Sequence, residues 1–361
     1  IKLDPDVALT YNNMGVAKDD LEDYKGAIED YTKAIELDPE YVDAYYNRGN
    51  SKDNLEDYKG AIEDFTKAIE LDPEYVDAYY NRGNSKDNLE DYKGAIEDFT
   101  KAIELDPEYV NAYANRGISK NNLEDYKSAI EDFTKAIELD PEYVNAYYNR
   151  GNSKENLEDN KGAIEDYTKA IELDPQYVNA YINRGYSKSK LEDYKGAIED
   201  FTKAIKLDPD VALTYNNMGV AKSKLEDYEG AIEDYTKAIE LDPELSLAYA
   251  NRGNLKDNLN DNFGAIYDYT RSIELNPKDS SAYRSRGDAK LDLEDFYGAI
   301  YDYTRAIEID PKDAIAYNNR CWSKYKMGKY KSALTDCNKS ILINPKDGNT
   351  YDSRGDVNFA L

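Results

Sequence analysis

The chain has 361 residues, with 46 Lys and Arg against 74 Asp and Glu and no His, so its formal net charge at pH 7 is −28. This charge would repel nucleic acids and anionic membranes, and the lack of His excludes every triad, general base and metal site that needs imidazole. We therefore expect no nucleic-acid or membrane partner, no catalytic residue, no metal and no cofactor. Two Cys and the absence of a basic-then-apolar segment after Ile1 leave the compartment open, with the cytoplasm preferred.

A strict period of 34 residues runs through the sequence. Glycines mark it at Gly15, Gly49, Gly83, Gly117, Gly151, Gly185, Gly219, Gly253 and Gly287, and Cys321 and Gly355 take the next two places. Counted from Ala8, the full units are residues 8–41, 42–75, 76–109, 110–143, 144–177, 178–211, 212–245, 246–279, 280–313 and 314–347. Residues 348–361 form a partial unit that should act as a terminal helix. Such a period indicates stacked repeats that bury their apolar faces against their neighbours.

Each unit is predicted to form two helices, as residues 76–109 illustrate. In the first half, Tyr79 and Gly83 recur at helical spacing, and Asp91 is a candidate N-cap for the second helix. The second half carries one apolar stripe at helical spacing, formed by Ala95, Ile96, Phe99, Ala102 and Ile103. Pro107 cannot continue the second helix and is preorganised to open the next one.

This pattern resembles the tetratricopeptide repeat, which has a large residue at position 4 of the unit, small residues at positions 8, 20 and 27, an aromatic at 24 and Pro at 32. In the third unit these are Tyr79, Gly83, Ala95, Ala102, Phe99 and Pro107. The resemblance implies an all-α fold, a single right-handed α-solenoid superhelix of stacked antiparallel helix pairs over residues 1–361. Arg82 and Lys86 depart from it, because they stand where Leu and an aromatic are expected, so we predict more polar packing.

The resemblance also implies a function. We expect a non-catalytic protein–protein interaction scaffold whose concave groove, lined by the first helix of each unit, takes an extended peptide. The partner should be a protein or peptide that is basic or contains aromatic residues. Two alternatives stay open: the substrate-recruiting arm of a larger enzyme, and a structural array that associates head to tail.

Charge varies between units. The third unit holds four bases against nine acids, a net of −5, whereas the tenth holds seven bases against two acids, a net of +5. This is either drift on a solvated face or a sign that the C-terminal end meets a more acidic partner.

Asparagines recur at position 6 of the unit, a position that lines the groove in the resembling family. They are Asn13, Asn47, Asn81, Asn115, Asn149, Asn183, Asn217, Asn251 and Asn319. A carboxamide both donates and accepts, so this row could grip the backbone of an extended peptide. The alternative is that Asn satisfies a local backbone group there.

The neighbouring groove positions should set side-chain preference. They carry Tyr46, Tyr80 and Tyr148 at position 5, Asn50, Asn84 and Asn152 at position 9, and Asp43 and Asp77 at position 2. Acids also recur at position 12, as Asp19, Asp53, Asp87 and Glu155, and would favour a basic segment. Trp322 occupies position 9 of the tenth unit and is either a binding anchor or a rim residue that packs on the final helix.

Two residue pairs are interpreted as structural. Arg recurs at position 7 and Asp at position 23, as in Arg116 and Asp132, which predicts an ion pair between the two helices of a unit. Because Met14 and Met218 replace this Arg naturally, Arg116→Met should be tolerated. Cys321 and Cys337 occupy interior positions 8 and 24 of one unit, and we interpret them as core thiols, with a disulfide as the alternative.

Overall fold

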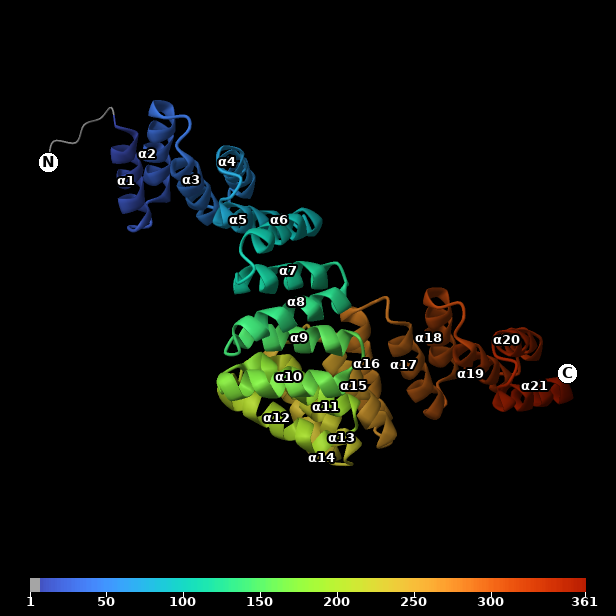
Figure 1. The fold of residues 1–361 in the computed structure, drawn as a ribbon. Helices are drawn as coiled ribbons and strands as arrows, with labels where there is room; N and C mark the ends of the chain where they lie inside the picture. Colours follow the sequence, from blue (N-terminus) through green and yellow to red (C-terminus); the bar gives the residue numbers. More distant parts are fainter. Residues whose placement is uncertain (1–6) are drawn as a thin grey trace. The chain divides into compact units, whose positions relative to one another are not determined.

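The computed structural model describes residues 7–361, which fold into helices joined by short turns (Figure 1). This part of the chain contains 21 helices and no strand, so the fold class is all-α, as predicted. The chain divides into two compact units, which we call the N-terminal half (Ile1–Ala180) and the C-terminal half (Tyr181–Leu361). Over residues 7–361, no helix combines the length and the apolar character needed to cross a bilayer.

Each repeat unit forms a first helix and a second helix, which pack against each other as an antiparallel pair. The helices that begin in the N-terminal half are α1 (Ala8–Asp19), α2 (Tyr24–Leu37), α3 (Val42–Asn54), α4 (Tyr58–Leu71), α5 (Val76–Asn88), α6 (Tyr92–Leu105), α7 (Val110–Asn122), α8 (Tyr126–Leu139), α9 (Val144–Asn156), α10 (Asn160–Leu173) and α11 (Val178–Lys190). Those of the C-terminal half are α12 (Tyr194–Leu207), α13 (Ala212–Lys224), α14 (Tyr228–Leu241), α15 (Ser246–Asn258), α16 (Asn262–Leu275), α17 (Ser280–Asp292), α18 (Phe296–Ile309), α19 (Ala314–Lys326), α20 (Tyr330–Ile343) and α21 (Gly348–Ala360). Every first helix starts at the first residue of a predicted unit. That the whole chain forms one continuous superhelix stays a prediction.

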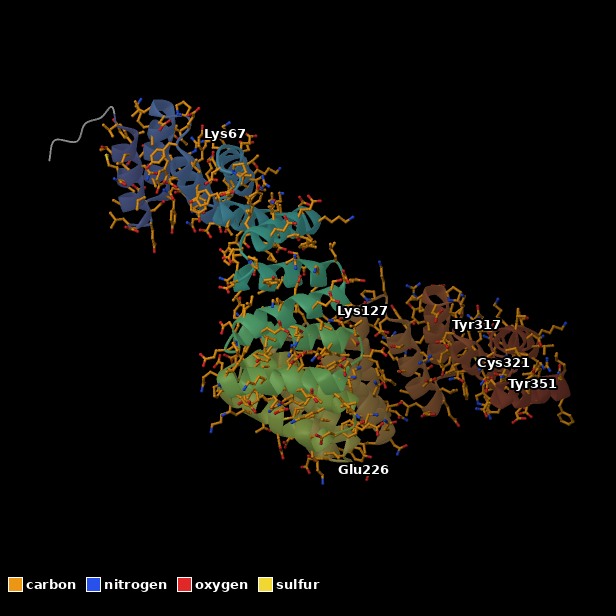
Figure 2. All side chains as sticks on the ribbon, in the orientation of Figure 1. Lys67, Lys127, Glu226, Tyr317, Cys321 and Tyr351 are labelled. Atoms are coloured by element: carbon orange, nitrogen blue, oxygen red, sulfur yellow. A yellow bond between two sulfur atoms is a disulfide. The ribbon has the colours of Figure 1, made fainter. Side chains whose placement is uncertain are left out.

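The turn inside each unit is closed by backbone geometry that the sequence did not predict. After α5, Glu90 adopts a left-handed conformation with φ 62°, and the N–H of Asp91 donates to the carbonyl of Lys86 at 2.9 Å. This is the arrangement that closes many helix C-termini, although Gly is the usual residue there. The Asp91 carboxylate then accepts from the N–H of Gly94 at 3.1 Å, which confirms Asp91 as an N-cap. Glu226, labelled in Figure 2, has the same left-handed conformation.

The turn between units is built around its proline. α6 ends at Leu105, and the N–H of Tyr109 donates to the carbonyl of Asp106 at 3.2 Å. Pro107 is therefore the second residue of a four-residue turn, a place that suits its fixed φ. The expectation that Pro107 opens the next helix is wrong, because α7 starts only at Val110.

The core of each unit depends on close contact between a glycine and an aromatic ring. Gly83 of α5 faces Phe99 of α6 so closely that a Cβ atom at Gly83 would lie 2.7 Å from Phe99 Cε1. Phe99 is fully buried together with Ala95 and Ala102 of the predicted stripe. The small residues thus set how near the two helices approach.

A buried ionic network completes the interior. Arg82 donates to Asp98 through Nε (2.9 Å) and Nη2 (2.6 Å), and Lys86 Nζ lies 2.7 Å from the same carboxylate. Arg82 Nη1 also donates to Thr66 of the preceding unit at 3.1 Å, and the guanidinium lies over the ring of Tyr79. The same Arg–Asp pair forms at Arg48, Arg82, Arg116, Arg150, Arg184, Arg252, Arg286 and Arg320. The predicted ion pair and the polar packing are therefore confirmed.

The two cysteines form a disulfide. Cys321 of α19, labelled in Figure 2, is bonded to Cys337 of α20, and their Cα atoms are 5.5 Å apart. The interpretation as free core thiols is wrong. The physical reason is the packing of the unit, since positions 8 and 24 are the two that face each other elsewhere as Gly83 and Phe99.

Candidate functional site

Consecutive first helices of the N-terminal half contact one another, and two hollows of similar chemistry lie along them. The hollow over α3 and α5 has a volume of about 340 Å³ and is lined by Asn50, Asp53, Asn54, Asn81 and Asn84. The next, over α5 and α7, has a volume of about 230 Å³ and is lined by Asn84, Asp87, Asn88, Phe99, Asn115 and Ile118. Each hollow combines positions 9, 12 and 13 of one unit with positions 6 and 9 of the next, so the repeat itself generates the site.

The predicted row of asparagines is largely occupied by contacts between units. Asn81 Nδ2 donates to Tyr46 Oη (3.0 Å) and Asn50 Oδ1 (2.9 Å) of the unit before it, and Asn115 makes the same two bonds one unit further on. Asn47, Asn251 and Asn319 each donate once, to Asn12, Asn216 and Asp288 respectively. Both amide hydrogens of Asn81 are thus used, so only its oxygen can serve a ligand.

Other asparagines of the row differ. Within residues 7–361, neither Asn149 nor Asn217 has an acceptor for its amide hydrogens, because the preceding unit offers apolar side chains at position 5, Ala114 and Ile182 respectively. Asn13 is exposed at the start of the row, and Asn183 is half-buried with a partner of its own. The capacity to grip a peptide backbone with both donor and acceptor therefore belongs to particular members of the row.

The predicted tyrosines at position 5 are packed against other aromatic rings. Tyr46 packs its ring 4.8 Å from that of Tyr75 and 5.9 Å from that of Phe65, between centroids. Tyr80 and Tyr148 are held in the same way in their own units. The hydroxyls of Tyr46 and Tyr80 accept from Asn81 and Asn115, so the role of these tyrosines toward a ligand stays a prediction.

The remaining predicted residues take several roles. Asn50 and Asn84 accept from the asparagines described above, and Asn152 accepts from Tyr167 Oη at 2.8 Å. Asp43 is exposed, and Asp77 accepts from Tyr109 Oη at 3.1 Å. Trp322 packs against Tyr325 and Lys326 on its own helix, so its role as an anchor stays a prediction.

A half-buried carboxylate lies in each of the two N-terminal hollows. Asp53 accepts from Ser85 Oγ and Asp87 from Ser119 Oγ, in both cases across the unit boundary through Oδ1. Burial raises the pKa of both carboxyl groups above the ordinary Asp value. No Lys or Arg lines either hollow, so the half-buried carboxylates favour a positively charged occupant that donates hydrogen bonds.

Sequence reasoning missed Asn54 and Asn88, which line these hollows from position 13. The signal was present, because position 13 follows position 9 by four residues and so lies on the same face of the first helix. It also missed the serines at position 10, whose hydroxyls bind the position-12 acids.

A second group of acids lies in the C-terminal half, on α15 and α17. Burial raises the pKa of Asp257 to about 6, and the nearby charges of Asp292 and Asp288 add to this. Asp288 itself accepts from Tyr303 Oη (2.7 Å) and Asn319 Nδ2 (2.9 Å). Burial, with a smaller contribution from these charges, therefore makes the ionisation of Asp257 unfavourable in the folded chain.

We expect thermal stability to rise as pH is lowered from 7 to 5. The folded-state pKa of Asp257 lies above its ordinary value of 3.8, so its favourable contribution is complete below 3.8 and is lost as pH rises through about 6. Asp257→Asn should raise Tm at pH 7 by roughly 1–3 °C and flatten the rise between pH 7 and 5. Calorimetry at several pH values measures this, with the exposed Glu199→Gln as a variant of equal charge change that should keep the slope of the unmodified chain.

Three comparisons with known proteins bear on this geometry. The family model described as "Tetratricopeptide repeat" matches residues 42–75, 76–109, 110–143, 144–177, 178–211, 212–245 and 314–347, and one described as "TPR repeat" matches residues 20–52. The matches of the first model coincide with seven of the predicted units. No curated protein matches the chain.

Solved structures match as well. The Cut9–Hcn1 hetero-tetramer of APC/C is 16% identical with a TM-score of 0.53, over 97% of this chain and 83% of that one. At this identity the likeness concerns the fold alone. YrrB, described as a TPR protein with an unusual peptide-binding site, is 30% identical over 51% of this chain and 95% of its own, with a TM-score of 0.46. MamA is 27% identical over 48% of this chain and 94% of its own, with a TM-score of 0.45.

Proposed function

The chain belongs to the tetratricopeptide repeat family, and on that premise we propose that it is a non-catalytic scaffold whose N-terminal half binds an extended basic peptide along α3, α5 and α7. The observation that carries the proposal is the pair of repeat-related hollows, each with a half-buried carboxylate and no base in its lining. A basic side chain is the occupant that this chemistry suits.

The hydrogen bonds already made by the residues that line the two hollows support a hydrogen-bond donor as the occupant. Asn81 and Asn115 spend their amide hydrogens on the preceding unit, and Ser85 and Ser119 spend their hydroxyl hydrogens on Asp53 and Asp87. The second oxygen of each carboxylate and the amide oxygens of Asn81 and Asn115 remain as acceptors, while amide N–H groups also line the hollows. A Lys or Arg side chain supplies several donors and a charge opposite to the carboxylate.

The spacing of the hollows supports an extended peptide. Because one hollow follows another at each step of the repeat, an extended chain laid across the first helices can place successive basic side chains in successive hollows. Half-burial strengthens each contact, since the interaction takes place at a lower effective dielectric than on an open surface.

The test measures binding of a fluorescein-labelled peptide in which Lys alternates with Ser, by fluorescence anisotropy at low salt. Asp53→Asn combined with Asp87→Asn should weaken binding about tenfold, because two partly buried charge contacts are lost. The fold should persist, since the fourth unit naturally has Asn121 at this position, accepting from Ser153 Oγ at 2.8 Å.

The matched control combines Glu63→Gln with Glu97→Gln, which removes two exposed acids from the second helices. It changes the net charge equally and should bind the peptide nearly as the unmodified chain does. Equal affinities for the unmodified chain and the Asp53/Asp87 variant would contradict the proposed site.

A further inference from the structure

A third hollow, in the C-terminal half, has different chemistry from the two in the N-terminal half. It lies over α11, α13 and α15 and has a volume of about 320 Å³. Its lining includes the buried ring of Phe201 and the partly exposed Tyr186, Val220 and Leu247. Tyr186 and Val220 thus occupy position 9 of the sixth and seventh units, while Asn216, Asn217 and Asn251 also line the hollow.

Two lysines contribute to the lining of this hollow. Lys190 and Lys224 come from position 13 of the sixth and seventh units, where the second to fifth units carry Asn. Lys190 Nζ lies 5.0 Å from the centroid of the Tyr186 ring, and Lys224 is exposed and makes no ion pair within residues 7–361. At position 12 these units carry Ser189 and Ser223, where the second and third units carry Asp53 and Asp87.

Two polar side chains of this hollow, Asn217 and Ser189, have hydrogen-bonding atoms without a partner in the described residues. Asn217 Oδ1 accepts from Asn216 Nδ2 at 3.3 Å, while its own amide hydrogens find no acceptor in the described part of the chain. The Ser189 hydroxyl is buried and has no hydrogen-bond partner within residues 7–361. Asn217 is thus a member of the asparagine row whose amide hydrogens can still donate to a ligand in this hollow.

We propose that this hollow binds a peptide segment in which a carboxylate side chain neighbours an aliphatic or aromatic one. The apolar side chain packs against Tyr186, Val220 and Leu247, the carboxylate meets Lys190 and Lys224, and Asn217 donates to the peptide backbone. The inference rests on the proposed function in that the ligand is again an extended peptide, but it assigns a segment of opposite charge to the C-terminal half.

The experiment uses the full chain and two fluorescein-labelled peptides. In the acidic probe Phe and Glu alternate with Ser, and in the second probe Lys replaces each Glu. Lys190→Glu combined with Lys224→Glu should weaken binding of the acidic probe about tenfold or more and improve binding of the lysine probe. Both lysines are exposed, so the fold should persist, and circular dichroism checks this.

The matched control is Lys195→Glu combined with Lys203→Glu, two exposed lysines of the second helix α12, with the same change of net charge. It should leave the affinity for the acidic probe within about twofold of the unmodified chain, because these charges lie outside the hollow. Val220→Asn, which removes apolar surface from the wall without a change of charge and has a precedent in Asn84 at the same repeat position, should also weaken binding of the acidic probe.

Three outcomes would overturn the inference: no binding of the acidic probe to the unmodified chain, equal loss in the lysine variant and its control, or no loss in either. Failure of this inference can be distinguished from failure of the proposed function. Binding of the lysine peptide that depends on Asp53 and Asp87 would uphold the N-terminal site even where the acidic probe fails.

Discussion

Asp132→Leu is expected to unfold part of the N-terminal half, at a cost of about 3–5 kcal/mol in the free energy of unfolding. Asp132 is 5% exposed and accepts from Arg116 through both oxygens, at 2.9 and 2.7 Å, while Lys120 Nζ lies 2.7 Å away. Removing the carboxylate leaves two cations in the interior without their partner. Urea denaturation followed by circular dichroism measures the loss.

Removing the other partner should cost much less, about 1–2 kcal/mol for Arg116→Met. The chain itself supplies the precedent at Met218, where Lys222 Nζ still lies 2.7 Å from Asp234, although burial raises the pKa of that carboxyl group. Thr100, which accepts from Arg116, would lose that one bond. Beside Met218 the hydroxyl of Thr202 keeps its donation to the backbone carbonyl of Ile198.

The contrast between the two variants decides what the network does. If Arg116→Met destabilised as much as Asp132→Leu, the arginine itself would be needed and Lys120 would not compensate. If neither substitution lowered the free energy of unfolding, the side chains of the network would be exposed to solvent in solution. Because contacts in a repeat array are mostly between neighbours, the loss should be confined to the units around the substitution and appear as a separate early transition.

The sequence predicts the helices and the interior well because both follow a single periodic pattern. Phe99 and Ala102 belong to a stripe at helical spacing, and Asp91 precedes it as an N-cap. Arg82 and Asp98 recur together in unit after unit, which predicts their pairing. Such features form within one unit, and their repetition along the chain makes them easier to infer.

The groove is less predictable because its hydrogen bonds cross unit boundaries. Whether the amide hydrogens of an asparagine in the row are free depends on the preceding unit. Those of Asn81 are used, because the preceding unit offers Tyr46 and Asn50 as acceptors. Those of Asn149 are free within residues 7–361, because the preceding unit has Ala114 in place of the tyrosine. A pattern read within one unit treats these asparagines as equivalent. Only the contacts between first helices separate them.

Charge counted per unit likewise hides the chemistry of the groove. The seventh unit has three bases against eight acids, a net of −5, yet it contributes Lys224 to the lysine-lined hollow. Many of its acids, such as Glu229 and Glu233, lie on the second helix, away from the hollow. The local potential of the groove therefore follows positions 12 and 13 more closely than the net charge of the unit.

Gly117→Ala should also destabilise the N-terminal half, by about 1–3 kcal/mol, because it overpacks a filled interior. A Cβ atom at Gly117 would lie 2.8 Å from Cε1 and 2.9 Å from Cζ of Phe133, whose ring is fully buried. Neither the ring nor the helix can shift without disturbing contacts on the other side. The gain of about 0.5–1 kcal/mol that Ala ordinarily brings to a helix is too small to offset this.

Gly355→Ala is the matched control, because Gly355 occupies the same repeat position in α21 and its Cβ would meet nothing within 4 Å. This variant should leave the chain as stable as before or slightly more stable, which isolates the steric cost at Gly117 from helix propensity. Phe133→Leu combined with Gly117→Ala should recover part of the loss, since the smaller side chain makes room for the methyl group. Equal stability of the Gly117 and Gly355 variants in urea would show that the interior yields, and that glycine at this position does not set the distance between the helices.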